Sequence, residues 1–398
     1  MANPRIVVVG AGPSGLTAAL FLVKAGVPVT VLESRTEIYE DPRAATFHPP
    51  TMEMLEPSGV TKRLHDLGIV CPQWQFRGRD EGVIAEFDLG LLADMTRYPY
   101  RLQCEQHKLV AILADFLAEE PGFTIRYGTT VEDVKQNSSG ATVITDDGSL
   151  YEAAYVIGAD GGRSIVRKSQ DIDFEGFTYQ ERFLVITTTT DFEAKGFAYS
   201  CYVSDPREWC ALFKVPGKGP PGLWRVVFPT PPEATVEELL DFAAAQQRLQ
   251  GFIAESKQHS IIHTNLYTVH QRVAETYRRG RVLLAGDAAH VNNPLGGMGM
   301  NFGIHDAVSL AAALARVLNG ESDDLLDLYD RQRRYVAKAF LQAMTIQNKR
   351  VLEEKDPVKR RERLEEMRST AADPAKARDF LLRTSMFEGL KSASHIAL

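Results

Sequence analysis

The chain has 398 residues, of which 44% are hydrophobic and 24% are charged, and its formal net charge is −7. A chain of this length and composition is expected to form two or three packed globular domains. The net negative charge argues against a nucleic-acid-binding surface. The sequence shows no stretch long and apolar enough to span a membrane and no leader at its start, so we expect a cytoplasmic protein.

The four cysteines are scattered along the chain, at Cys71, Cys104, Cys201 and Cys210. None of them belongs to a CxxC pair, so the sequence predicts neither a disulfide framework nor a bound metal. The chain also contains no internal repeat.

The first elements along the chain are predicted to be a strand, a helix and a second strand. Residues 6–9 form a β-branched run, which is typical of a buried parallel strand. Residues 15–25 favour a helix that ends at Gly26. Residues 29–32 form the second buried strand. This order predicts a βαβ unit.

A GxGxxG motif, formed by Gly10, Gly12 and Gly15, stands between the first strand and the helix. In this context the first glycine allows a tight turn, the second lets the backbone approach a pyrophosphate, and the third permits close helix–strand packing. The start of the helix favours phosphate through its dipole, and Ser14 can add a hydroxyl donor. Glu33, at the end of the second strand, can bind both ribose hydroxyls and would repel a 2′-phosphate. The motif predicts FAD or NAD, and a generic tight turn is the alternative.

The rest of the chain changes character several times. Residues 123–154 predict a meander of three short strands. Residues 174–268 alternate β-branched and aromatic runs with Pro/Gly turns, which predicts a separate antiparallel sheet with a helix at 235–247. Residues 281–285 predict a buried strand that returns to the first domain, and the chain then becomes helical. The charge run at 356–366 is expected to be a solvated helix face.

A further glycine-rich region follows the strand at 281–285. Asp287 stands where a ribityl hydroxyl can be bound, and the glycines of residues 294–301 let the backbone lie flat against a ring system. A helix that opens near Met300 and Asn301 points its dipole at a ring edge. A reduced flavin carries negative charge on its pyrimidine side, and an enzyme that uses only NAD has no need of this region. The region therefore favours FAD.

Together with Gly158-Ala-Asp160-Gly161, these motifs resemble the class A flavoprotein aromatic monooxygenases, the group of p-hydroxybenzoate, phenol and 3-(3-hydroxyphenyl)propionate hydroxylases. The resemblance covers most of residues 5–345. It implies an α/β fold: a Rossmann-like FAD-binding domain, an inserted antiparallel-sheet (α+β) substrate domain and a helical C-terminus. We expect the FAD-binding domain to comprise residues 1–72, 97–172 and 269–345, the substrate-binding sheet domain residues 73–96 and 173–268, and the C-terminal helical segment residues 346–398.

The resemblance also implies an activity. FAD would take electrons from NADH or NADPH, react with molecular oxygen to form a flavin hydroperoxide, and hydroxylate a small phenol or hydroxylated N-heteroaromatic compound. The alternatives are a same-fold FAD-dependent reductase, a halogenase, and a non-catalytic FAD-bound redox-sensing protein. The charged C-terminal helices are a candidate homodimer interface.

The resemblance assigns cofactor-binding residues by position. Those expected at the ADP part are Gly10, Gly12, Ser14, Gly15, Glu33, Arg35 and Val131. Those expected near the pyrophosphate, ribityl chain and isoalloxazine ring are Arg43, Gln103, Asp160, Gly161, Asp287, Gly299, Met300 and Asn301. Arg163 is a candidate for NAD(P)H binding. Arg35 and Arg163 also read as surface charges, Asp160-Gly161 as a turn, and Arg43 and Gln103 as capping or ion-pairing residues.

Two residues are candidates for the chemistry itself. Pro294 is expected beside the site of oxygen transfer. His48 can deprotonate the substrate if it titrates near neutral pH, and its alternative role is to fix a Pro-rich loop. The candidate substrate-binding residues of the second sheet are Tyr199, Tyr202, Phe213, Trp224 and Arg225, which also read as core residues.

Overall fold

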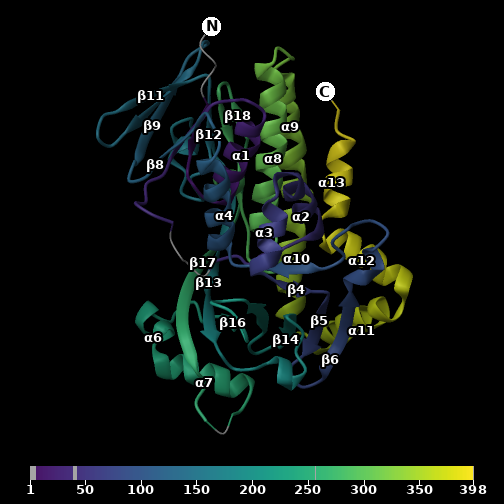
Figure 1. Cartoon of the computed structure of the whole chain (residues 1–398). Coiled ribbons are helices and arrows are strands. Elements are labelled where there is room, and N and C mark those ends of the chain that lie inside the picture. The colour runs from purple at the N-terminus through teal and green to yellow at the C-terminus, as the bar shows by residue number, and fades with distance from the viewer. Residues whose placement is uncertain (1–5, 39–42, 256, 398) are drawn as a thin grey trace.

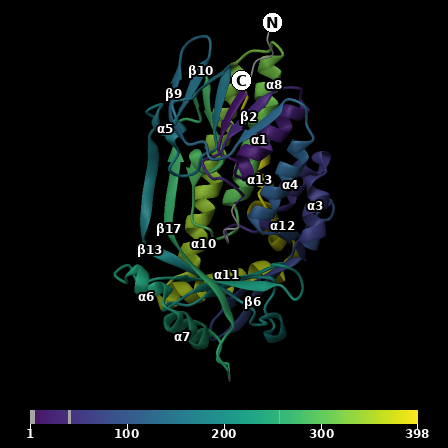
Figure 2. The same ribbon diagram turned by 60° about the vertical axis from the view of Figure 1, so that its left-hand side comes forward.

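The computed structural model describes residues 6–38, 43–255 and 257–397, arranged around two large sheets (Figure 1). A mostly parallel sheet forms the core of the upper part in this view, and a mostly antiparallel sheet forms the core of the lower part. Two long strands, β13 (Phe174–Thr188) and β17 (Ile261–Ala274), pair with each other and extend from one part into the other (Figure 2). The expected α/β class with a second antiparallel sheet is confirmed.

The upper sheet has the strand order β18–β19–β12–β1–β2–β8. Its strands are β1 (Ile6–Val9), β2 (Val29–Leu32), β8 (Phe123–Arg126), β12 (Tyr155–Gly158), β18 (Arg278–Arg279) and β19 (Val282–Leu284). All of them run parallel except β18, which pairs antiparallel at one edge. Because both faces of the sheet are covered, β1, β2 and β12 are buried along their whole length, which explains their continuous apolar sequence.

Helices cover one face of this sheet and a small sheet covers the other. The helices are α1 (Pro13–Lys24), α4 (Gln106–Ala118) and α8 (Gly299–Leu318), and α1 contacts both of the others. The small antiparallel sheet consists of β9 (Val131–Gln136), β10 (Ala141–Thr145) and β11 (Leu150–Ala153), and the short helix α5 (Ile165–Lys168) packs beside it. The expected meander is therefore present, and β8, from the same segment, joins the parallel sheet instead.

The lower sheet has the order β20–β17–β13–β16–β15–β14–β5–β6. Its remaining strands are β5 (Gln73–Gly78), β6 (Gly82–Asp88), β14 (Ser200–Ser204), β15 (Cys210–Val215), β16 (Leu223–Pro229) and β20 (His290–Val291). Successive side chains point to opposite faces, so the sheet separates two clusters of buried side chains. One cluster packs against α7 (Phe242–Phe252), and the other faces the C-terminal helices.

The single helix expected at residues 235–247 is instead two helices, α6 (Val236–Leu240) and α7. Asp241 lies between them with extended backbone angles, φ −60° and ψ 133°. Its carboxylate accepts a hydrogen bond of 2.9 Å from the backbone N–H of Ala244 and so caps α7. Capping by Asp241 starts a new helix and ends the first one.

The C-terminal segment is helical and returns over both parts of the molecule. It contains α9 (Asp324–Val336), a π-helical turn η5 (Ala337–Gln342), α10 (Ala343–Leu352), α11 (Pro357–Ala372), α12 (Pro374–Thr384) and α13 (Phe387–Ser394). Asp356 and Asp373 cap α11 and α12, and each is followed by a proline, which suits the first helical position. Helix α11 packs on β6 and α13 packs on α9. No helix within the described ranges is long and apolar enough to cross a membrane.

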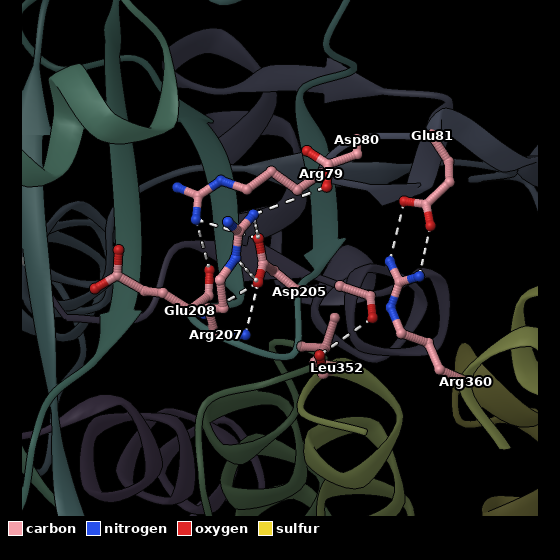
Figure 3. Close-up of polar contacts among 9 residues, drawn as sticks. Arg79, Asp80, Glu81, Asp205, Arg207, Glu208, Leu352 and Arg360 are labelled. Atoms are coloured by element: carbon pink, nitrogen blue, oxygen red, sulfur yellow. Dashed lines mark hydrogen bonds and ion pairs between the residues drawn. The ribbon is translucent and has the colours of Figure 1, made fainter. Parts of the chain in front are cut away.

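An ion pair attaches α11 to the antiparallel sheet, and a backbone hydrogen bond attaches α10 (Figure 3). Arg360 of α11 donates to the Glu81 carboxylate, at 2.5 and 3.0 Å. The backbone N–H of Asp205 donates to the carbonyl of Leu352, at the end of α10, over 3.3 Å. The Asp205 carboxylate in turn accepts from Arg79 at 3.3 Å. These contacts hold the C-terminal helices against the edge of the sheet formed by β5, β6 and β14.

A fourth sheet, small and antiparallel, joins the two parts. It consists of β3 (Thr46–Phe47), β7 (Arg101–Gln103) and β4 (Ile69–Cys71). The helix α2 (Pro49–Leu55), which follows β3, packs on α8, and β7 contacts β15 of the antiparallel sheet; α3 (Val60–Leu67) packs on α4. This β3–β7–β4 sheet therefore places its side chains where the two parts meet.

A buried carboxylate fixes the start of the β19–α8 connection. Asp306 of α8 is completely buried and accepts hydrogen bonds from His290 Nε2 at 2.7 Å, Arg333 Nε at 2.7 Å and the Gly286 N–H at 3.1 Å. Burial alone would raise the pKa of Asp306, but His290 and Arg333 outweigh burial and lower the pKa to about 2. The carboxylate therefore stays ionised and ties the Gly286 turn, α8 and α9 together. His290, which is buried and bonded to Asp306, therefore has a structural role.

We predict that Asp306→Asn lowers the free energy of unfolding by about 3 to 5 kcal/mol, because it leaves the Arg333 guanidinium buried without a counterion. The measurement is urea-induced unfolding followed by far-ultraviolet circular dichroism.

The matched control is Asp323→Asn, which removes the exposed ion pair between Asp323 and Arg278. Exposed pairs contribute at most about 1 kcal/mol, so this variant should remain close to the wild type. Equal losses in the two variants would contradict the role assigned to the buried carboxylate.

Candidate active site

The turn between β1 and α1 requires glycine at two positions. Gly10 has φ +101°, and a Cβ on it would overlap the backbone carbonyl of Ala159. A Cβ on Gly15 would overlap the Gly10 carbonyl oxygen. A Cβ on Gly12 would meet no atom within 4 Å, so this glycine faces open space. The first turn of α1 has neither a side-chain cap nor an acidic residue, and its N–H groups are available to a phosphate.

Glu33, at the end of β2, lies beside this turn. Its carboxylate accepts hydrogen bonds from the backbone N–H of Ala11 at 2.7 Å and of Arg35 at 3.0 Å. Its backbone carbonyl accepts from the N–H of Thr129 at 2.9 Å, which brings the start of β9, at Val131, to the same place. Glu33 and Val131 thus lie around the same turn, and Arg35 is exposed at the surface; their contacts to the ribose and adenine stay a prediction.

Ser14 brings two distant segments into contact. Its Oγ occupies the space beside Gly286 and Gly303, so that a Cβ on either glycine would overlap it. Since Ala159 touches Gly10 on the other side of the same turn, three regions that are remote in the sequence meet at the N-terminus of α1. A single nucleotide can therefore contact all of them.

Asp160 uses both carboxylate oxygens to begin α5. One oxygen accepts from Ser164 Oγ at 2.5 Å, and the other accepts from the N–H of Ile165 at 2.7 Å. Burial raises the pKa of Asp160. The carboxylate thus acts as a helix cap, while Gly161, with φ +82°, faces open space and Arg163 is exposed. Cofactor contacts by these residues stay a prediction.

Asp287 follows the Gly286 turn and lies deep in the protein, yet its side chain is accessible to solvent. Burial raises the pKa of Asp287, and the nearby charges of His290 and Arg43 counteract that effect. Arg43 is held in place through its carbonyl, which accepts from Arg225 Nη1 at 2.5 Å. Arg43 and Asp287 are therefore close enough to share one ligand.

The N-terminus of α8 faces the same region. The helix begins at Gly299, its N-cap Met298 provides no side-chain cap, and its first turn contains no acidic residue. The N–H groups of Gly299 and Met300 are consequently available to a negatively charged ring edge.

Asn301 has a different role from its neighbours, because its side chain is fully hydrogen-bonded. Its Oδ1 accepts from the N–H of His48 at 3.0 Å, and its Nδ2 donates to the carbonyls of Thr46 at 2.8 Å and Gly297 at 2.7 Å. Only the backbone of Asn301 can contact a cofactor, and its side chain fixes β3 against the glycine-rich turn.

Gln103 presents an unsatisfied polar atom to this region. The side chain is completely buried, and its Oε1 accepts from Thr46 Oγ1 at 3.0 Å. Its Nε2 has no hydrogen-bond partner among the residues that the structure describes. A buried amide left without a partner is destabilising, so this donor indicates a ligand with an acceptor group. The ribityl hydroxyls of FAD fit that requirement.

His48 does not have the properties of the expected base. It is completely buried, and its Nε2 donates to the carbonyl of Gly296 at 2.9 Å. Burial, reinforced by the positive charge of Arg101, lowers the pKa of His48 to about 3. The side chain is therefore neutral near pH 7 and a weak base. The expectation that His48 titrates near neutral pH is wrong, and its alternative role of fixing the loop agrees with the structure.

A cavity of about 380 Å³ lies between the antiparallel sheet and the C-terminal helices, within the size range of small-molecule sites. Its inner wall is formed by Trp74, Phe76, Arg101, Tyr202, Gly296 and Met298. Helices α10, α11 and α12 form the opposite wall, which includes Asn348, Met367 and Phe380. Gly296 and Met298 immediately precede α8, so the cavity adjoins the expected flavin end of the cofactor site.

Only Tyr202 of the five candidate substrate residues lines this cavity. Phe213 lies behind it, in edge-on contact with ring centroids 5.8 Å apart, and Arg225 binds the Arg43 carbonyl instead. Tyr199 and Trp224 pack in the cluster on the opposite face of the sheet, against α7. The expectation that these two line the substrate pocket is corrected, because their strand positions place them on the other side.

Pro294 begins the turn that leads to α8. It is exposed, and its carbonyl accepts from the Gly297 N–H at 3.0 Å. The Gly296 N–H donates to the Tyr202 hydroxyl at 3.1 Å, which fixes the turn to β14. A role for Pro294 in oxygen transfer stays a prediction.

Two kinds of cavity residue were missed by the sequence analysis. Arg101 lies two residues before Gln103, so both side chains lie on one face of β7, and this alternation was a usable signal. Residues of the C-terminal helices, such as Asn348 and Phe380, gave no local signal, because their place in the cavity depends on how these helices fold back.

Comparisons with known proteins agree with this geometry. A family model described as FAD binding domain matches residues 4–344. The para-nitrophenol 4-monooxygenase of Pseudomonas sp. (strain WBC-3) is 34% identical over 389 residues, which cover 96% of each chain. The 6-hydroxy-3-succinoylpyridine 3-monooxygenase HspB of Pseudomonas putida is 32% identical and covers 83% of this chain and 85% of its own. The crystal structure of p-nitrophenol 4-monooxygenase PnpA from Pseudomonas putida has a TM-score of 0.91, with 34% identity and 97% of both chains covered.

The fold and the site define an FAD-dependent aromatic monooxygenase, with a Rossmann-type nucleotide site beside an aromatic-lined cavity. The chain belongs to the FAD binding domain family, among the class A flavoprotein aromatic hydroxylases. These relatives are monooxygenases, which favours hydroxylation over the reductase, halogenase and non-catalytic alternatives.

We predict that Gly12→Ala raises the Kd for FAD by about 10-fold or more and leaves the stability of the apoprotein nearly unchanged. The added Cβ meets no protein atom but occupies the side of the turn that a pyrophosphate must approach. Quenching of flavin fluorescence measures the affinity, and thermal melting of the apoprotein measures its stability.

The matched comparison is Gly15→Ala, in which the Cβ overlaps the Gly10 carbonyl. This variant should lower the melting temperature even without FAD. A Gly12→Ala variant that binds FAD as tightly as the wild type would show that the pyrophosphate lies elsewhere.

We predict that His48→Gln reduces the loss of stability on acidification. Because the pKa of native His48 is lowered from 6.5 to about 3, the unfolded chain takes up a proton below pH 6.5 that native His48 does not. The stabilisation from neutral His48 is therefore complete above pH 6.5 and is lost as the pH falls toward 3, at up to about 1.4 kcal/mol per pH unit.

Denaturant unfolding at about pH 7 and about pH 5 measures this slope. The exposed His395 supplies the control, and His395→Gln should keep the wild-type slope. An unchanged slope in His48→Gln would contradict the neutral state of the buried imidazole.

Proposed function

We propose that this monooxygenase hydroxylates a small phenol or hydroxylated N-heteroaromatic compound, with FAD as cofactor, NADH or NADPH as electron donor and molecular oxygen as co-substrate. One observation carries the proposal: an aromatic-lined cavity of about 380 Å³ adjoins the turn that leads into α8. Aromatic walls suit a ring-shaped substrate. The names of the relatives, a nitrophenol and a hydroxypyridine monooxygenase, support this substrate class.

The residues present would hold FAD along the path already described. The turn at Gly10–Gly15 and Glu33 would bind the ADP part, and Asp287 and Gln103 would bind the ribityl chain. When bound, FAD supplies the redox chemistry that transfers electrons from NAD(P)H to oxygen. The free N–H groups at the start of α8 would stabilise negative charge on the ring.

The protein itself contributes orientation and the exclusion of water. Tyr202 and the turn at Gly296 hold one wall in a fixed position, and α10, α11 and α12 close the opposite side. Burial within such a cavity strengthens every electrostatic contact to the substrate.

Two finer features belong to the same proposal. A cytoplasmic location would give the enzyme access to NAD(P)H. A homodimer would use the charged face of α11. Leu364 is the only residue of this helix that is buried in the single chain. Light scattering of the purified protein measures its mass and tests the dimer.

We predict that aromatic compounds stimulate NAD(P)H oxidation by the purified holoprotein, because an occupied cavity excludes water and places the ring beside the flavin site. The panel contains 4-nitrophenol, pentachlorophenol and hydroxypyridines, each with NADH and with NADPH. Mass spectrometry under ¹⁸O₂ should find one labelled oxygen atom in the product.

A chlorinated product, a saturated product or the absence of stimulation by any phenol or hydroxypyridine would each count against hydroxylation. The same panel without NAD(P)H is the control, and it should yield no product.

A further inference from the structure

Arg101 is a buried cation in the wall of the cavity. It lies on β7, its side chain is 2% exposed, and its guanidinium lies over the Trp74 ring with the central carbon 5.4 Å from the ring centroid. One terminal nitrogen donates to Ser200 Oγ at 3.4 Å. The guanidinium is therefore fixed in the inner wall, next to Tyr202 and the turn at Gly296.

In the part of the chain that the structure describes, Arg101 forms no ion pair, and its buried Nε has no hydrogen-bond partner. Two other deeply buried cations are paired, Arg333 with Asp306 at 2.7 Å and Lys349 with Glu181 at 2.5 Å, and the buried Arg167 donates to the backbone carbonyls of Ala288 and Gly162. A buried charge without a counterion is strongly destabilising. A free donor and an uncompensated positive charge together indicate an anionic ligand.

The groups around Arg101 do not supply that anion. Arg101 contributes to the pKa shifts of three titratable side chains, His48, Cys71 and Tyr202. Burial raises the pKa of Cys71 to about 11 and also raises the pKa of Tyr202, so both are neutral near pH 7.

The charged residues of the opposite wall are Arg363, Glu366, Lys376, Asp379 and Arg383. All of them except Arg363 are exposed to solvent, and none forms an ion pair with Arg101 within the described ranges.

We propose that Arg101 binds the ionised hydroxyl oxygen of the aromatic substrate, so that the cavity selects phenolates. The substrate O–H bond breaks, its proton passes to water, and the electron pair remains on the oxygen, which the guanidinium stabilises. The Tyr202 hydroxyl, whose oxygen accepts from the Gly296 N–H at 3.1 Å, lies in the same wall and can donate to this oxygen. This inference rests on the proposed function.

A positive charge at Arg101 favours the phenolate without the base that His48 does not provide. Hydroxylation requires an electron-rich ring, and a phenolate meets that need. Among the described residues no carboxylate forms an ion pair with Arg101, and His48 is a weak base. The inner wall therefore favours the anion through a fixed positive charge instead of a proton acceptor. Arg101 is thus a residue for substrate binding and specificity.

The first test uses the wild-type holoprotein and 4-nitrophenol, whose phenol and phenolate forms have different visible spectra. The titration is made without NAD(P)H, about one pH unit below the pKa of free 4-nitrophenol, and is recorded as a difference spectrum. The bound ligand should show the phenolate spectrum. A bound ligand with the neutral phenol spectrum would overturn the proposal, and this measurement needs no variant.

The second test compares Arg101→Met and Arg101→Lys by their Kd values for 4-nitrophenol and for its methyl ether, 4-nitroanisole, which cannot ionise. A hydrogen bond to a charged group corresponds to about 10- to 100-fold in affinity, so Arg101→Met should weaken 4-nitrophenol binding by that factor. Binding of the ether should change less than about 2-fold, and Arg101→Lys should lie between Arg101→Met and the wild type.

The matched control is Arg77→Met. Arg77 also stacks on an aromatic ring, with its central carbon 4.2 Å from the Phe197 centroid, but it does not line the cavity. This variant should bind both ligands like the wild type. Equal losses for both ligands in Arg101→Met, or unchanged binding of 4-nitrophenol, would overturn the proposal.

FAD content and melting temperature are measured for each variant. Release of FAD from both Arg101 variants would show that the guanidinium serves the flavin, and would also overturn the proposal. Failure of the proposed function gives a different pattern: phenolate bound in an Arg101-dependent way by a protein that incorporates no labelled oxygen from ¹⁸O₂.

Discussion

The close approach of backbone to backbone at the N-terminus of α1 is the constraint on which the site depends. Gly10 contacts Ala159, Gly15 contacts Gly10, and Ser14 fits against Gly286. Each approach is possible only because a glycine lacks a Cβ. Together they bring the ends of β1, β12 and β19 to one place, at the edge where parallel strands of an open α/β sheet bind ligands.

The small β3–β7–β4 sheet links this cofactor site to the cavity. Gln103 and Arg101 lie on one face of β7, two residues apart, and each has a buried nitrogen without a partner among the described residues. Gln103 is next to the expected ribityl chain, whereas Arg101 lines the cavity. One strand of three residues would thus present a donor to the cofactor and a cation to the substrate. The Asn301 side chain fixes the neighbouring strand β3 against the glycine-rich turn.

Buried charged side chains have two different roles in this protein: one stabilises the fold, and the other is available to a ligand. Asp306 has its partners built in, and it fixes the Gly286 turn to α8 and α9. Arg101 has no counterion among the described residues, so its charge is available to a ligand. The two groups are similarly buried, and the difference lies in whether the fold itself supplies the opposite charge.

The sequence by itself determined the nucleotide site, because that site consists of short segments whose geometry is local. Gly10, Gly12, Gly15 and Glu33 belong to one βαβ unit, and the glycine-rich segment at 294–301 leads directly into its helix. Tertiary structure alone decided the substrate side. Alternation along β14 and β16 shows that a strand has two faces, but only the packing of α7 and the C-terminal helices shows that Tyr202 faces the cavity and Trp224 does not. The low pKa of His48, and the lack of a counterion for Arg101 among the described residues, could not be predicted from the sequence either. Burial and charge pairing depend on residues that are distant in the chain and close only after folding.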